Sequence, residues 1–138
     1  MRPLVIVDTN IVVAGLLTRS PQSPVAAILD GMLSAAIPFA LSEALLAEYR
    51  NVLGRPHLRA LHRLTIDEID VLLTDIALHA AVLVPSPGPP APDPGDQMLW
   101  DLLAFRAELF LVTGDAALLA DATMRGRVVS ARAFIDAG

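Results

Sequence analysis

Two aspartates of this 138-residue chain follow short apolar runs. Asp8 comes directly after Leu4–Val7, and Asp115 comes three positions after the end of Leu109–Val112. Such runs are typical of strands buried in a parallel sheet, and ligands bind beyond the carboxyl ends of those strands. We therefore expect both carboxylates at one edge of the sheet. The structural alternative for Asp8 is that it only caps the next helix.

Two further acids could join them. Asp96 begins the helix before the second of these strands, and in an alternating α/β sheet that helix end also faces the carboxyl edge. Glu48 lies on the helix expected after Ser42. Carboxylates gather around positive charge, and oxygen ligands without cysteine select a hard cation such as Mg²⁺ or Mn²⁺. Such a site is suited to phosphoryl or phosphodiester chemistry.

The elements that would position these acids alternate between strand and helix, which predicts an α/β fold with a parallel sheet between helices. The expected strands are 4–7, 38–41, 81–84, 109–112 and 127–129, and the expected helices are 11–17, 25–34, 42–53, 65–78, 96–106, 116–121 and 131–136. Segment 85–95 holds six prolines and two glycines, so we expect an ordered connection there. We expect residues 1–138 to form one domain.

The composition limits the function classes. With 54% hydrophobic and 18% charged residues, a disordered chain is excluded. The net charge of -5 disfavours a broad nucleic-acid-coating surface but is compatible with an acidic nuclease site. Absence of cysteine removes disulfides and thiolate chemistry and suits the cytoplasm. We expect no signal peptide and no membrane span, because the apolar segment 24–41 is interrupted by Gly31, Ser34 and Pro38.

Four segments resemble PIN domains, in particular the group of VapC-like toxin components. They are Val5–Asn10, Ser42–Tyr49, Asp93–Asp96 and Leu111–Asp115, in the order of the family. The resemblance implies a Rossmann-like sheet of about five parallel strands, metal-dependent ribonuclease activity, a homodimer and a small antitoxin partner. By motif position the acids of the family fall on Asp8, Glu48, Asp96 and Asp115, with Asn10 and Thr113 as supporting polar residues.

Two of these placements have competitors. Glu48 flanks the apolar stripe of its helix, whereas Glu43 lies further from that stripe on the other side. Asp93 lies in the proline-rich segment, and Asp101 lies in mid-helix, one turn further from the strand ends than Asp96. We favour Glu48 and Asp96 as the site residues.

A basic segment between Arg50 and Arg63 contains no acidic residue. Its arginines, Arg50, Arg55, Arg59 and Arg63, are candidates for contact with RNA phosphates. The alternatives are a solvated helix end and loop, or a surface for an acidic partner. Sequence patterns alone do not separate these interpretations.

The leading hypothesis is a cytoplasmic Mg²⁺- or Mn²⁺-dependent endoribonuclease, the toxin of a toxin–antitoxin pair. A phosphatase of the haloacid dehalogenase type also starts with an apolar strand and an aspartate. It needs a second aspartate where this chain has Asn10, and a lysine, which the chain lacks. The rival from another class is a PIN-fold module that binds RNA or protein without catalysis. The presence of all four motif acids counts against that rival.

Overall fold

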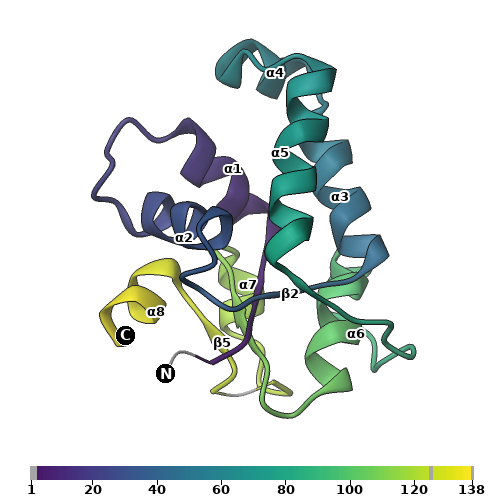
Figure 1. The fold of residues 1–138 in the computed structure, drawn as a ribbon. Coiled ribbons are helices and arrows are strands. Elements are labelled where there is room, and N and C mark those ends of the chain that lie inside the picture. The colour runs from purple at the N-terminus through teal and green to yellow at the C-terminus, as the bar shows by residue number, and fades with distance from the viewer. Residues whose placement is uncertain (1–2, 125, 138) are drawn as a thin grey trace.

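The computed structural model describes residues 3–124 and 126–137 (Figure 1). The strands of this part are β1 (Val5–Val7), β2 (Ala40–Leu41), β3 (Ala81–Val82), β4 (Phe110–Val112) and β5 (Val128–Val129). All pairings are parallel, in the order β1-β4-β5 and in a separate pair β2-β3. A parallel bridge between Val5 and Phe39 connects the two sheets. The α/β prediction with about five parallel strands is confirmed.

Helices follow or precede each of these strands. They are α1 (Thr9–Leu17), α2 (Pro24–Leu33), α3 (Glu43–Leu53), α4 (Pro56–His62), α5 (Ile66–His79), α6 (Gln97–Phe105), α7 (Ala116–Leu119) and α8 (Ala131–Ala137), with a 3₁₀ turn η1 (Pro94–Asp96). Local side-chain bonds begin several of them. Ser42 Oγ accepts from the Leu45 amide at 3.2 Å, and Thr65 and Glu68 form a reciprocal capping box.

The core lies where the strands meet the helices. Both central strands are buried, and the largest side chains buried among them are Trp100, Tyr49 and Phe39. Helices α1, α2 and α8 form one packed group, and α3 packs against α5 and α6 (Figure 1). Within residues 3–124 and 126–137, no helix has the combined length and apolarity of a membrane span.

The structure differs from the sequence prediction between residues 54 and 65, where no helix was expected. Helix α4 (Pro56–His62) occupies this segment. Proline is well suited to the first position of a helix, but α4 contains no buried residue. The apolar periodicity that identifies most helices is therefore missing here. Several element boundaries also differ from the expected ones; for example, α1 begins at Thr9, β2 begins at Ala40 and β3 ends at Val82.

Candidate functional site

The register of the two central strands positions the first acid of the site. Val7 of β1 lies opposite Val112 of β4, so Asp8 and Thr113 leave the sheet side by side. The Thr113 hydroxyl donates a 2.7 Å hydrogen bond to Asp8 Oδ2. Asp8 is 7% exposed and Thr113 is fully buried. The Asp8 carboxylate is thus fixed in orientation at the carboxyl edge of the sheet.

The same threonine also fixes the last acid. The Asp115 amide donates to Thr113 Oγ1 at 3.0 Å, so one hydroxyl connects the Asp8 carboxylate to the backbone of Asp115. Asp115 Oδ1 in turn accepts from the Ala117 amide at 2.8 Å and begins α7. In the described structure, the other carboxylate oxygen of Asp115 has no hydrogen-bond partner, so it is available to a ligand.

Asn10 connects the two loops that carry these acids. It lies in the first turn of α1, and its side-chain Oδ1 accepts from the Gly114 amide at 3.3 Å. Gly114 belongs to the loop between β4 and α7. Asn10 and Thr113 therefore both form hydrogen bonds that connect the segment after β1 to the segment after β4. This is the role expected of residues that support a site.

Glu48 and Asp96 are close enough to the other acids for their charges to interact. The pKa of Asp96 is raised to about 6, first by partial burial and then by the negative charges of Asp8, Asp115, Asp93 and Glu48. Asp96 stands at the cap position of α6, yet its side chain accepts no capping hydrogen bond. Asp96 therefore carries a raised pKa under the combined effect of burial and four neighbouring charges, with no capping hydrogen bond to offset it.

The pKa of the Asp8 carboxyl is also raised. Burial is the main cause of its raised pKa, and the charge of Asp115 adds to it. The hydrogen bond from Thr113 and those from the Thr9 and Asn10 amides act in the opposite direction. These donors favour the ionised carboxylate, which is the form that binds a cation.

The family model of the PIN domain matches residues 4–117. The chain belongs to the PIN-domain family. The matched range includes Asp8, Glu48, Asp96 and Asp115, and PIN domains are commonly nucleases that bind divalent metals. No curated protein matches the chain significantly.

The competing acids lie elsewhere or have other partners in this PIN domain. Glu43 is exposed at the start of α3 and lines a groove between α3 and α5. Asp101 Oδ1 accepts from the Gly88 amide at 2.8 Å and from the Gln97 side chain at 3.0 Å, which holds the proline-rich segment against α6. Asp93 accepts from the Gly95 amide at 2.8 Å and adds its charge to the neighbourhood of Asp96.

Tyr49 is a residue of the site region that the sequence names only as the end of the motif segment Ser42–Tyr49. It follows Glu48 on α3, is fully buried, and donates its hydroxyl hydrogen bond to the Val7 carbonyl, next to Asp8. Burial and, second, the charge of Asp8 raise the pKa of Tyr49. A buried tyrosine hydroxyl needs a partner, but the sequence does not name it. Tyr49 thus joins α3 to the strand end of the PIN domain that carries Asp8.

The arginines of the basic segment divide into two kinds. Arg50 forms an ion pair with Asp70 of α5, Nε to Oδ1 at 2.8 Å, which raises the pKa of the guanidinium. Arg55, Arg59 and Arg63 flank or lie on α4 and are exposed. Arg50 therefore belongs to the contact between α3 and α5, whereas the other three arginines face solvent.

The donor chemistry of the acidic group fits a hard divalent cation, since every side chain offers carboxylate oxygen. Yet within residues 3–124 and 126–137, no three acidic or histidine side chains are arranged so that together they could hold a metal ion. Mg²⁺ usually keeps several waters and takes only one or two protein carboxylates. The residues therefore fit a cation bound largely through water, and not a closed protein cage.

Proposed function

We propose that this PIN domain is a Mg²⁺- or Mn²⁺-dependent endoribonuclease. The observation that carries the proposal is that Asp8 and Asp115 meet at the carboxyl edge of the sheet, where both bond to the Thr113 hydroxyl. The pKa of Asp96, raised by burial and by the charges of Asp8, Asp115 and Glu48, supports it. Such a group of like charges is unfavourable without a cation, and a folded protein retains it when it serves a function. The chain belongs to a family whose members are commonly nucleases, and this supports the same proposal.

Each acid has a distinct part in the proposal. Asp8 and Asp115 are the most rigidly held, through Thr113 and the first turn of α7, so they would hold the ion directly. Glu48 and Asp96 would act through bound water. A divalent ion there supplies a deprotonated water and offsets the charge of the phosphate. Thr113 and Asn10 keep the two loops together during the reaction.

Cleavage of RNA by purified protein tests this proposal. The parent should cut RNA with Mn²⁺ present and should stop in EDTA. Loss of a residue that hydrogen-bonds to a metal ligand typically lowers activity about 10- to 100-fold. Loss of a ligand itself should cost at least as much, so Asp8→Asn should reduce the cleavage rate by about 100-fold or more. Asp30→Asn is the matched control, since it removes the same charge from an exposed position on α2. Equal rates for Asp8→Asn and the parent would refute the proposal.

We also propose that the enzyme is the toxin of a toxin–antitoxin pair, acting in the cytoplasm as a homodimer with a small antitoxin as inhibitor. The support is the resemblance of its four motif segments to VapC-like toxins. Expression should stop growth, and co-expression of a short neighbouring reading frame should restore it. Sedimentation should give twice the mass of the chain. Harmless expression of an active nuclease would contradict the toxin role without affecting the nuclease proposal.

A second candidate is a PIN-fold module that binds RNA without cutting it. The absence of a ready three-ligand metal group among the described residues favours it. The same experiment separates the two candidates, because the module would bind RNA equally with Mn²⁺ or EDTA and leave it intact. In that case Asp8→Asn should increase RNA affinity slightly, since it removes a repelling charge.

A further inference from the structure

Three arginines lie along the segment of helix α4, and we call them the row. Arg55 directly precedes the helix, Arg59 lies within it, and Arg63 directly follows it. Arg55 has an extended backbone and Arg63 a left-handed one, so the three arginines are neighbours along one short segment and not a stripe on one helix face. All three side chains are exposed. The row is therefore a local group of positive charges on the surface of a chain whose net charge is -5.

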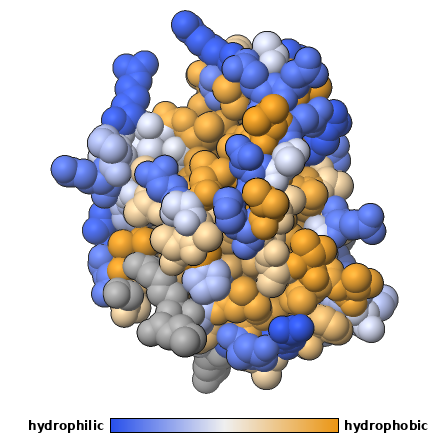
Figure 2. Space-filling view, in the orientation of Figure 1, coloured by the Kyte–Doolittle hydropathy of each residue, from blue (hydrophilic) through white to orange (hydrophobic). Residues whose placement is uncertain are grey.

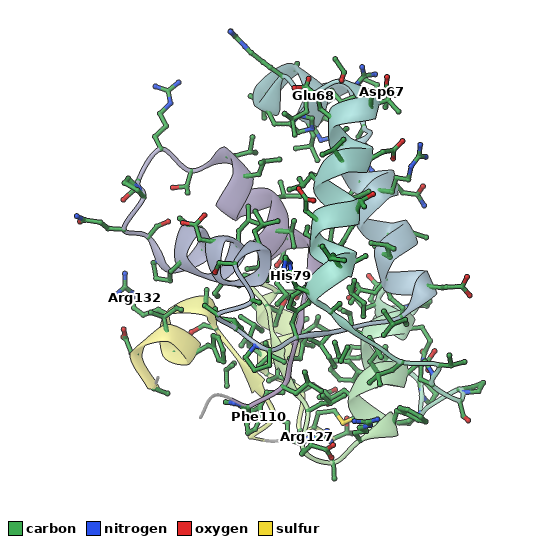
Figure 3. All side chains as sticks on the ribbon, in the orientation of Figure 1. Asp67, Glu68, His79, Phe110, Arg127 and Arg132 are labelled. Carbon is green, nitrogen blue, oxygen red and sulfur yellow. The ribbon has the colours of Figure 1, made fainter. Side chains whose placement is uncertain are left out.

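The row lacks counter-charges. Across residues 3–124 and 126–137, neither Arg55, Arg59 nor Arg63 forms an ion pair or a side-chain hydrogen bond. Three other arginines have partners, because Arg50 and Arg106 form ion pairs with Asp70 and Glu108. Arg127 binds three backbone carbonyls at the amino edge of the sheet, near Phe110 in Figure 3.

Nearby acids among the described residues form no ion pair with the row. Asp67 and Glu68 lie at the end of α5 that is near α4, as Figure 3 shows. Glu68 Oε1 accepts from the Thr65 amide at 3.0 Å, so it is engaged in the capping box of its own helix. Asp67 forms no ion pair with any described residue. The guanidinium groups of the row are consequently free to bind an external anion.

Helix α4 projects from the body of the protein, above α3 and α5 in Figure 1, and the same region is hydrophilic at the top of Figure 2. None of its residues is buried. His62 anchors it: Nε2 lies 2.9 Å from the Leu53 carbonyl, and Nδ1 accepts from the Leu64 amide at 3.0 Å. Helix α4 thus presents side chains to solvent from a fixed position and adds little to the core.

The row lies next to two helices that carry residues of the candidate site. Helix α4 packs against α1 and α3, the helices that carry Asn10 and Glu48. Arg55 lies just beyond the end of α3, two positions after Leu53, so the row begins where the helix that carries Glu48 ends.

We propose that Arg55, Arg59 and Arg63 bind the phosphate backbone of the RNA substrate outside the acidic site. The inference rests on the proposed ribonuclease function. Arginine binds phosphate through paired N–H donors, and a group of unpaired cations suits a polyanion. An acidic protein would also need an apolar centre in its contact. The exposed Leu61 is offset from Arg59 by two positions, and so lies on another side of α4.

The test is RNA binding across a salt series. Fluorescence anisotropy with a labelled single-stranded RNA in EDTA measures binding without cleavage. Each phosphate contact contributes about 0.7 to the slope of log affinity against log salt. The variant Arg55→Gln/Arg59→Gln should reduce that slope by about 1.4 and weaken binding at least about tenfold at low salt. The control, Arg19→Gln/Arg106→Gln, removes two charges from exposed positions elsewhere and should bind like the parent.

Each result supports or overturns the inference. Equal losses in the row and control variants would show a general charge effect and overturn it. A row variant that keeps its RNA affinity but loses binding to poly-glutamate would assign the row to an acidic protein instead. If the parent cleaves RNA with Mn²⁺ while the row variant binds RNA normally, the inference fails and the proposed function stands. If the parent neither binds nor cleaves RNA, both fail.

Discussion

Replacing Asp96 by asparagine should stabilise the metal-free protein. The pKa of this carboxyl is raised to about 6 from an ordinary value of 3.8. An acid whose pKa is raised in the folded state opposes folding once it is ionised. The penalty is absent below the ordinary pKa, grows between pH 4 and 6, and is complete above that range. Asparagine removes the charge and keeps the shape.

The magnitude follows from the shift. Roughly two pKa units correspond to at most about 3 kcal/mol, at 1.36 kcal/mol for each unit. Asp96 is partly exposed, so solvent screens the repulsion, and we expect a gain of about 1 kcal/mol at pH 7.5. For a domain of this size the melting temperature should rise by about 4 °C.

Thermal unfolding in EDTA, followed by circular dichroism at pH 4 and pH 7.5, measures this gain. Asp96→Asn should melt above the parent at pH 7.5 and close to it at pH 4. Asp30→Asn, which removes an exposed carboxylate of α2, should change the melting temperature little at either pH.

Two results would refute the reasoning. A lower melting temperature for Asp96→Asn at pH 7.5 would show that the carboxylate stabilises the fold, contrary to the effect of burial and neighbouring charges. An equal gain at both pH values would show that the effect is not electrostatic. In the second case the charges of Asp8, Asp115 and Glu48 would not act on Asp96.

Three further outcomes are expected. Tyr49→Phe should reduce the free energy of unfolding in urea by about 1–3 kcal/mol, because a buried carbonyl of β1 loses its donor; a change under 0.5 kcal/mol would contradict this role. Thr113→Val should lower the cleavage rate by about 10- to 100-fold, since Asp8 loses its orienting donor, and rates equal to the parent would contradict a supporting role. Asp101→Ala should accelerate limited proteolysis within segment 85–95, whereas unchanged cleavage there would show that Asp101 does not hold the segment.

The regular elements of the fold were accessible from sequence because their causes are local. Apolar runs such as Leu109–Val112 identify buried strands, and Ser42 and Thr65 begin helices by bonding to amides three residues on. Helix α4 was missed because it buries nothing, and so has no apolar stripe. Asp8 and Asp115 could be expected together because parallel strands bring their carboxyl ends to one edge.

Other features depend on partners that are distant in sequence. Arg50 belongs to a basic segment, yet Asp70, twenty positions later on another helix, removes it from that surface. The Tyr49 hydroxyl bonds to a carbonyl forty-two positions earlier. No local pattern identifies such partners, because packing alone determines which side chains meet.

The sequence by itself therefore determined the fold class and the four candidate acids, through short-range periodicity, capping and recognisable motif segments. Only the tertiary structure decided how these acids affect one another. The raised pKa of Asp96 reflects burial together with charges from four other positions along the chain. Burial and charge separation are distances in space, and those distances exist only once β1, β4, α3 and α6 have packed together.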